Sequence, residues 1–230
     1  MRLVLFDIDG TMLLSGGAGH RALKKAIQET FGRADSMDGI RPDGKTDPAI
    51  IKEALSRFGK EDCYTEDAAT SLFSLYVPFL RYELEQSENF QVLPGTRELV
   101  SSLSRNPEIL LGLATGNIEK GARLKLEKAG LNSFFSFGGF GDDAENRTEL
   151  ICAAIARGHK AASANQLDVT IVIGDTPRDI VHGKEAGAKT IATASGSYSL
   201  DALKAYKPDM AIASLEPIKP VLEFIETTTN

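Results

Sequence analysis

The sequence predicts an α/β fold: a doubly wound, Rossmann-like parallel sheet core with an inserted α-helical cap domain. Three short aliphatic runs support the sheet, because each ends abruptly in polar residues and two are followed by a helix-length segment, as in buried parallel strands joined by crossover helices. A long helical stretch without strands supports the insert. The three runs are Leu3–Phe6 before Asp7, Ile109–Ala114 before Thr115, and Val169–Ile173 before Gly174-Asp175.

Further strands and helices alternate along the second half of the chain, which favours a layered α/β arrangement. The additional strands are expected at Phe134–Phe137, Thr190–Ala194 and Met210–Ala213. The helices are expected at Ile118–Ala129, Asn146–Gly158 and Pro177–Ala186. Gly130 and Gly187 stand where two of these helices would stop. Ligands bind at the carboxyl ends of the strands in such sheets, so the polar residues after the three aliphatic runs are expected to share one site.

Residues 15–92 differ from this pattern, since they show helical periodicity and no convincing strand. The expected helices are Ala18–Phe31, Asp47–Phe58 and Thr65–Glu85. A glycine-rich segment precedes the first helix and Leu93-Pro94-Gly95 follows the last, which provides flexible joints at both ends. We therefore expect an α/β catalytic core of residues 1–14 and 93–230, and a helical cap of residues 15–92 above the strand ends.

The composition excludes several classes of partner. With 26 Lys and Arg against 32 Asp and Glu, the net charge is −6 and no basic run is present, which disfavours nucleic acid and anionic membrane surfaces. No apolar stretch approaches the ~18 residues of a membrane-spanning helix, and Asp7 interrupts the first apolar run too early for a signal peptide. Cys63 and Cys152 are far apart and form no metal motif. We expect a cytoplasmic protein; its oligomeric state is not indicated.

The segment Asp7-Ile8-Asp9-Gly10-Thr11 follows the first expected strand and brings two carboxylates close together. Paired carboxylates repel each other unless a cation or a shared proton relieves the repulsion. One of them can act as a nucleophile toward phosphorus, and the other can exchange a proton with the leaving group and with water. The alternative is a polar turn at the end of a strand, because Asp and Gly both favour turns.

Gly174-Asp175-Thr176-Pro177-Arg178-Asp179 is the second motif at a strand end. Carboxylate oxygens are the hard ligands that Mg²⁺ prefers. The alternative is helix capping, because Thr176 is a good N-cap before Pro177 at the first helical position. Both interpretations can hold, since the cap would fix the loop that presents Asp175.

Two weaker signals follow the strand at Ile109–Ala114. In Thr115-Gly116-Asn117, a hydroxyl and successive backbone N–H groups before a helix could cradle a phosphate, or Thr115 could be an ordinary N-cap. Arg147 opens a later helix after an acidic run. A fixed cation there could bind phosphoryl oxygens and offset the carboxylates, although an isolated arginine is more often a solvated surface residue.

The order of these motifs resembles the four motifs of the haloacid dehalogenase superfamily, and the resemblance covers nearly the whole chain. The insert after the first motif is similar to that family's helical type-one cap. Within the superfamily, the chain is most similar to the branch of phosphoglycolate phosphatases and β-phosphoglucomutase relatives. The resemblance implies that Asp7 is the nucleophile and a metal ligand, and that Asp9 is the acid/base with its carbonyl on Mg²⁺. It also implies that Asp175 is an acidic metal ligand, with Asp179 as a further acid of variable role.

The resemblance further implies a phosphate site made by Gly10, Thr115, Gly116, Asn117 and Arg147. The third motif usually supplies a lysine, whereas this chain has Arg147. Arginine keeps the positive charge, but its guanidinium can bind a partner through two nitrogens, whereas lysine acts as a point charge. In the expected cap, Gly44-Lys45-Thr46-Asp47 is similar to the specificity loop of related phosphatases. Lys45 is therefore a candidate substrate-binding residue, although Asp47-Pro48 is also a good helix start.

The expected function is a Mg²⁺-dependent phosphomonoester hydrolase acting through a phosphoaspartate on a small soluble ester, with phosphoglycolate and sugar phosphates as candidate substrates. Cap closure would exclude bulk water, which favours a small substrate over a phosphoprotein. A sugar phosphomutase would use the same residues and release no free phosphate. A catalytically inactive phosphate-binding protein is the alternative from a different class. A dehalogenase is disfavoured, because that branch lacks the second acid that Asp9 represents.

Overall fold

Strand β1 (Arg2–Phe6) lies inside a six-stranded sheet of the computed structural model, which describes residues 1–33, 37–162 and 166–229. The strand order is β5-β4-β1-β6-β7-β8, and every neighbouring pair is parallel. Leu5 pairs with Gly112 on one side and Val172 on the other. The other strands are β4 (Ile109–Ala114), β5 (Gly138–Gly139), β6 (Val169–Gly174), β7 (Lys189–Thr193) and β8 (Met210–Ile212).

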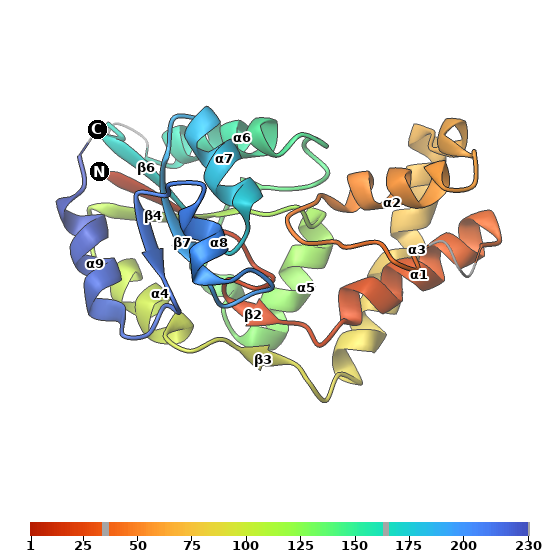
Figure 1. Cartoon of the computed structure of the whole chain (residues 1–230), viewed down its shortest axis with the longest axis horizontal. Helices are drawn as coiled ribbons and strands as arrows, with labels where there is room; N and C mark the ends of the chain where they lie inside the picture. Colours follow the sequence, from red (N-terminus) through yellow and green to blue (C-terminus); the bar gives the residue numbers. More distant parts are fainter. Residues whose placement is uncertain (34–36, 163–165, 230) are drawn as a thin grey trace.

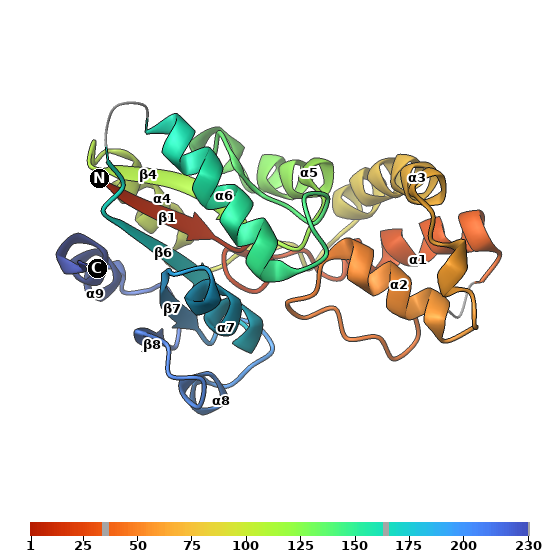
Figure 2. The same ribbon diagram turned by 90° about the horizontal axis from the view of Figure 1, so that it is seen from above.

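Successive side chains of a strand point to opposite faces of the sheet. Because the apolar side chains of β1 are buried on both faces, helices cover both of them. Val4 and Phe6 pack into an apolar cluster with residues of α4 (Thr96–Ser104), α5 (Glu119–Ala129) and α9 (Ile218–Thr227). Leu3 and Leu5 pack on the other face against α6 (Arg147–Ala161). The remaining core helices are α7 (Pro177–Glu185) and α8 (Leu200–Lys204). The doubly wound α/β fold that the sequence predicts is therefore confirmed (Figure 2).

The strand predicted at Phe134–Phe137 is wrong. Asn132–Phe134 forms a short 3₁₀ helix, and the pairing strand β5 lies further on at Gly138–Gly139. The aromatic run is used for packing, because Phe135 is buried with its ring edge-on to Phe6 at 5.8 Å between centroids. The apolar residues of this short run therefore pack in the core and do not form a paired strand.

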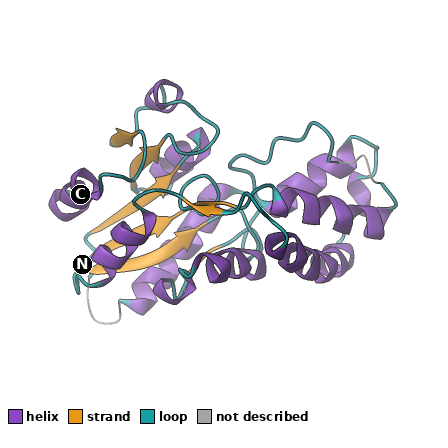
Figure 3. Ribbon diagram, turned by 90° about the horizontal axis from the view of Figure 1, so that it is seen from below, coloured by secondary structure: helices purple, strands orange, loops and turns teal. Residues whose placement is uncertain are grey.

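Residues 15–92 are mainly helical, and their helices are α1 (Ala18–Phe31), α2 (Asp47–Ser56) and α3 (Glu66–Glu85), with a short 3₁₀ turn at Glu61–Cys63. Threonine side chains cap two of them: Thr46 accepts a hydrogen bond from Ala49 N, and Thr65 accepts one from Ala68 N. The three helices share an apolar cluster of their own, which includes Leu23, Ile51 and Leu80 and also takes in Ile118 and Leu124 beside the sheet. This part of the chain stands at one end of the molecule, and both termini lie at the other end (Figures 1 and 3).

A small antiparallel pair, β2 (Leu13–Leu14) with β3 (Gln91–Val92), joins the helical segment to the core. The sequence patterns did not predict this pair, since two residues are too few for alternation to register. Because the two strands are hydrogen-bonded, the chain leaves the core and returns to it at one place. None of the helices in the described ranges is both long and apolar enough to cross a membrane.

Candidate active site

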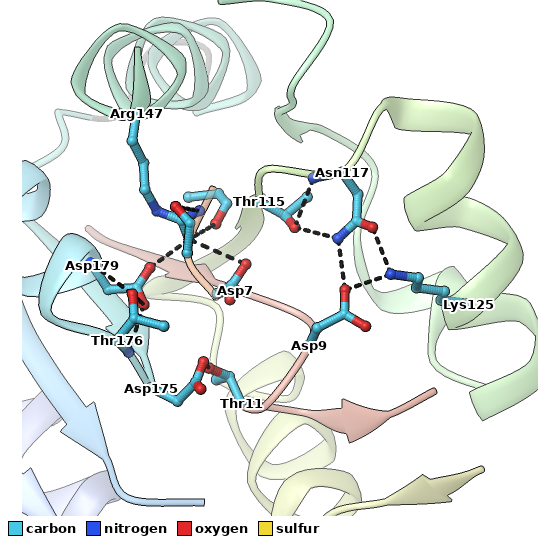
Figure 4. A network of polar contacts seen from close by, with 12 residues as sticks. Asp7, Asp9, Thr11, Thr115, Asn117, Lys125, Arg147, Asp175, Thr176 and Asp179 are labelled. Carbon is cyan, nitrogen blue, oxygen red and sulfur yellow. Dashed lines mark hydrogen bonds and ion pairs between the residues drawn. The ribbon is translucent and has the colours of Figure 1, made fainter. Parts of the chain in front are cut away.

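Polar side chains from three neighbouring strands meet at the carboxyl edge of the sheet (Figure 4). Asp7 follows β1, Thr115 follows β4 and Asp175 follows β6. The parallel topology brings these positions together even though Asp7 is more than a hundred residues from the other two in the sequence. Arg147 reaches the same place from the first residue of α6.

Asp7 and Arg147 form a buried ion pair at the centre of the site. Arg147 Nη2 lies 3.2 Å from Asp7 Oδ1 and also donates to Asp179 Oδ1. Both side chains are almost fully buried, so the surface alternative for Arg147 is wrong. Burial raises the pKa of Asp7 to about 6, against the lowering effect of Arg147 and with further increases from Asp179 and Asp9. Burial lowers the pKa of Arg147, but Asp179 and Asp7 more than offset this and raise it.

Asp7, Asp175 and Asp179 form an acidic cluster whose oxygen atoms lie within 4.8 Å of one another. All three side chains are buried, and burial together with Asp179 and Asp7 holds the pKa of Asp175 well above its usual range. Buried carboxylates this close repel one another unless a cation or protons balance their charge. Three hard oxygen donors at this spacing fit a divalent cation such as Mg²⁺.

Gly10 allows the loop after β1 to pass close to Asp175. Its φ of 82° lies in the left-handed region, which suits glycine, and a Cβ at this position would clash with the Asp175 carboxylate. Thr11 Oγ1 donates to Asp175 Oδ1 at 3.1 Å, and Ser195 Oγ donates to the Gly10 carbonyl at 2.8 Å. The loop therefore holds Asp175 against β1.

Asp9 lies apart from the acidic cluster, and its side chain has its own partners. Lys125 Nζ lies 2.5 Å from Asp9 Oδ2, and Asn117 Nδ2 donates to the same oxygen at 2.8 Å. Lys125 also donates to Asn117 Oδ1 at 2.6 Å, which closes a three-membered network. The side chain of Asp9 is thus not part of the cation cluster, and the predicted role of its backbone carbonyl stays a prediction.

Lys125 is the main site residue that the sequence patterns missed. Its side chain is 4 % exposed, although it lies on α5 among other lysines that are exposed. The available signal was its position about two helical turns after Asn117, which brings both residues to the same side of the helix. That spacing also occurs between surface residues, so it does not single out Lys125.

Thr115, Gly116 and Asn117 form the turn between β4 and α5. Thr115 is not an ordinary N-cap, because the helix has Ile118 as its N-cap and begins at Glu119. The hydroxyl oxygen of Thr115 accepts from Asn117 Nδ2 at 2.8 Å and from Asn117 N at 3.4 Å. Gly116 lies directly under the helical segment, where a Cβ would clash with the Lys45 carbonyl oxygen.

Asp179 has a structural role as well as a place in the cluster. The Thr176 side chain accepts from Asp179 N, and Asp179 Oδ2 accepts from Thr176 N at 2.9 Å and from Thr176 Oγ1 at 2.7 Å. This is a capping box with Pro177 at the start of α7. The capping interpretation of this motif is therefore correct, and it coexists with the cluster.

The loop before α2 closes the site from above. Asp47 N donates to the Gly116 carbonyl at 2.7 Å, and Ile118 N donates to Asp47 Oδ2 at 2.9 Å. Lys45 lines the resulting cavity of about 500 Å³, but its ammonium is bound to Glu53 of α2. Asp7, Asp9, Asp175 and Arg147 line the same cavity.

The comparisons with known proteins agree with this geometry. Residues 4–193 match the profile of the haloacid dehalogenase-like hydrolases. The chain is similar to the pyrophosphatase PpaX of Oceanobacillus iheyensis, with 23% identity over 225 residues that cover 95% of each chain. It is also similar to a phosphoglycolate phosphatase of Aquifex aeolicus, with 25% identity over 87% of this chain and 88% of the relative.

Among solved structures, a β-phosphoglucomutase from Clostridium difficile has the same fold, with a TM-score of 0.69 and 18% sequence identity. The matched regions cover 98% of this chain and 96% of that one. The family profile spans most of the sequence and includes all the strand-end residues of the site. The chain therefore belongs to the haloacid dehalogenase-like hydrolases.

Proposed function

We propose that the protein is a Mg²⁺-dependent phosphomonoester hydrolase that acts on a small phosphate ester through a phosphoaspartate on Asp7. The observation that carries this proposal is the separation of two carboxylates from one loop. Asp7 lies beside Asp175 and Arg147, among groups suited to a cation and a phosphoryl group. Asp9 is held by Lys125, away from that cluster and on the cavity wall. Family membership and the phosphatase names of relatives support the same class of reaction.

In the first step, a carboxylate oxygen of Asp7 attacks phosphorus, and the bond between phosphorus and the ester oxygen breaks. Asp9 donates a proton to the departing oxygen, so the alcohol leaves in neutral form. Arg147 and Thr115 bind the phosphoryl oxygens and stabilise the charge that develops on them. In the second step, Asp9 takes a proton from water, which attacks phosphorus and releases inorganic phosphate from Asp7.

The side chains of Asp7 and Asp175, with the backbone carbonyl of Asp9, would hold Mg²⁺. The bound ion supplies positive charge that lets a phosphate approach three carboxylates. Asp179 lies in the same cluster and keeps Arg147 in place through their ion pair. The donor set is made of oxygen atoms alone, which suits Mg²⁺ over softer metals.

The test is hydrolysis of p-nitrophenyl phosphate, followed by release of both nitrophenol and inorganic phosphate. We expect turnover with Mg²⁺, none in excess chelator, and recovery when Mg²⁺ is restored. Asp7→Asn should remain folded by circular dichroism and show no detectable turnover, because an amide does not form the acyl-phosphate. Asp201→Asn changes an exposed aspartate that does not line the cavity and is the matched control.

Two results would contradict the proposal: full activity in excess chelator, or substantial turnover by Asp7→Asn after contaminating phosphatases are excluded. Measuring the inorganic phosphate released from a sugar phosphate distinguishes the hydrolase from a sugar phosphomutase, which moves a phosphoryl group without releasing inorganic phosphate. Binding of phosphate without turnover of any ester would instead indicate the inactive phosphate-binding protein.

A further inference from the structure

The cavity above the reactive carboxylates is also lined by residues of the helical segment, which supply both apolar and polar side chains. Its volume of about 500 Å³ exceeds what a phosphoryl group occupies, so a leaving group of substantial size fits. Leu14, Leu23, Met37 and Ile50 line this part of the cavity. The leaving group is therefore expected to present apolar surface to the wall.

The positive charges that line the cavity are already committed to carboxylates. Within the described residues, the lining lysines and arginine are paired as follows: Lys45 with Glu53, Lys125 with Asp9, and Arg147 with Asp7 and Asp179. His20 also lines the cavity, but burial and the nearby Lys24 lower its pKa, so it is neutral at pH 7. In this structure a second negative charge on a substrate would therefore compete with these carboxylates for the cations.

Asp47 adds negative charge to the same wall. Its side chain is 7 % exposed and lines the cavity. One of its oxygens accepts a hydrogen bond from Ile118 N at 2.9 Å, and the other has no hydrogen-bond partner within the described part of the chain. A leaving group that carries a hydroxyl would satisfy this free oxygen, whereas a carboxylate or a second phosphate would be repelled by it.

Tyr76 provides a second polar contact in the cavity. The residue is 1 % exposed, lines the cavity, and its hydroxyl makes no hydrogen bond within the described residues. The hydroxyl keeps some exposure to the cavity, so a ligand atom that reaches it can form a hydrogen bond there. Asp47 and Tyr76 together would fix the orientation of a neutral alcohol.

We propose that this chain acts on phosphate monoesters whose leaving group is an uncharged alcohol with an apolar body and a hydroxyl for Asp47, and that it discriminates against pyrophosphate and phosphoglycolate. The inference rests on the proposed phosphatase function. The proposed substrates differ from those named for two relatives, a pyrophosphatase and a phosphoglycolate phosphatase, because both of those leaving groups are anionic at neutral pH.

The experiment compares esters that differ in the charge of the leaving group and little else. One pair is phosphoglycolate and its primary amide. The other is benzyl phosphate with a para carboxylate or a para hydroxymethyl group, where the reacting bond is nearly unchanged. At pH 7 with saturating Mg²⁺, we expect kcat/KM to be at least about tenfold higher for the neutral member of each pair, and pyrophosphate to be the poorest substrate.

Variants locate the source of the preference. Asp47→Asn still accepts the hydrogen bond from Ile118 N but removes the negative charge, so the ratio between neutral and carboxylate esters should fall at least about threefold. Glu53→Gln frees the charge of Lys45 and should change the ratio in the same direction. Glu29→Gln removes an exposed carboxylate on the outer face of α1 and should leave the ratio unchanged.

The outcomes separate this inference from the function on which it rests. Faster turnover of phosphoglycolate or pyrophosphate than of the neutral esters overturns the inference while the phosphatase function stands. Absence of Mg²⁺-dependent turnover with every ester overturns both. A neutral preference that Asp47→Asn does not alter contradicts the role given to Asp47.

Discussion

Arg147 places one guanidinium nitrogen between Asp7 and Asp179 where almost no solvent reaches. Its Nε is buried and without a partner within the described residues. A lysine at this position would supply one point charge, whereas the arginine contacts both carboxylates through Nη2 alone and has its Nε–H left over. In the proposed phosphatase reaction, a phosphoryl oxygen would be the acceptor for that remaining donor.

We expect Arg147→Ala to lower kcat/KM by about 10²–10³, as removal of a single charge-stabilising donor commonly does. Arg147→Lys should recover part of this loss, because it keeps the charge without the fork. Arg157→Ala is the control, since this arginine lies on the same helix but pairs with Asp143 at the surface. Steady-state kinetics of the three variants test the role, and Arg147→Ala with wild-type kcat/KM would contradict it.

Asp47 provides a prediction about stability as a function of pH. Burial raises its pKa to about 6 from the usual 3.8, although Lys125 and the Ile118 N–H lower it. Between these two values the folded state binds the proton more tightly than the unfolded state, so the carboxyl costs stability as pH rises through this window. Asn does not titrate and escapes this cost.

The stability of Asp47→Asn relative to wild type should therefore increase with pH. In urea unfolding, the free energy of unfolding of the variant minus that of wild type should rise by about 2 kcal/mol between pH 4.5 and pH 7. Glu29→Gln, which removes an exposed carboxylate of α1, is the control measured alongside it. A pH-independent difference for Asp47→Asn would show that the carboxyl titrates alike in both states.

The sequence predicted those site residues whose position in space follows from their place after a strand. Asp7, Thr115 and Asp175 each follow an aliphatic run, and parallel strands bring such residues to one edge. Lys125 and the pairing of Lys45 with Glu53 were not predictable in this way. Their places depend on which face of a helix is buried and on how the helical segment lies over the sheet, and neither is encoded in a local pattern.

At the scale of elements, the contact between the loop before α2 and the turn after β4 decides whether the cavity is closed. Asp47 N, at the start of α2, donates to the Gly116 carbonyl of the turn at 2.7 Å, and Thr46 Oγ1 of the loop donates to the Glu145 carbonyl before α6 at 3.2 Å. Backbone atoms can approach this closely only where one partner has no side chain, and Gly116 meets that condition.

Gly116→Ala should therefore keep the loop from seating, because the added methyl group would occupy the place of the Lys45 carbonyl oxygen. We expect kcat/KM to fall by at least about tenfold, since an open site admits water and loosens the substrate. Gly121→Ala is the matched control, because a Cβ there makes only ordinary contacts, the nearest at 3.4 Å. Equal activity of the two variants would contradict this role of the turn.

Elements with long, regular patterns were predicted best, and short ones worst. The helices at Ala18–Phe31 and Pro177–Glu185 lie where the sequence places them, the second to within one residue. The strand at Phe134–Phe137 was misplaced, because its aromatic residues serve the core without pairing. Helix α9 was not predicted despite its buried Val221 and Ile225, since Pro217 and Pro220 obscured its start.

At the scale of the whole molecule, the helical segment and the sheet meet at the cavity, so opening requires the one to move against the other. We expect this motion to be a lid movement with bending near Ser15–Gly19 and Leu93–Gly95. Two amides, Asp47 N and Ile118 N, are hydrogen-bonded across the boundary and report on it directly.

Hydrogen exchange at these two amides should be faster than at amides of β1 and β6 in the free protein, and should slow when Mg²⁺ and orthovanadate occupy the site. The strand amides serve as the internal control, because they lie in the centre of the sheet. If ligand leaves the exchange of Asp47 and Ile118 unchanged, the closed form is permanent and the lid does not move.

The central position of β1 also has a consequence for how the chain is made. Its two neighbours are β4 and β6, and β6 begins more than 160 residues after β1 ends. At a synthesis rate of roughly 5–20 residues per second, Leu3–Phe6 waits on the order of 10–30 s for its second partner. Until β6 is made, one edge of this apolar strand has no partner even after β4 has joined it, so it is a segment that a chaperone on the nascent chain would have reason to hold.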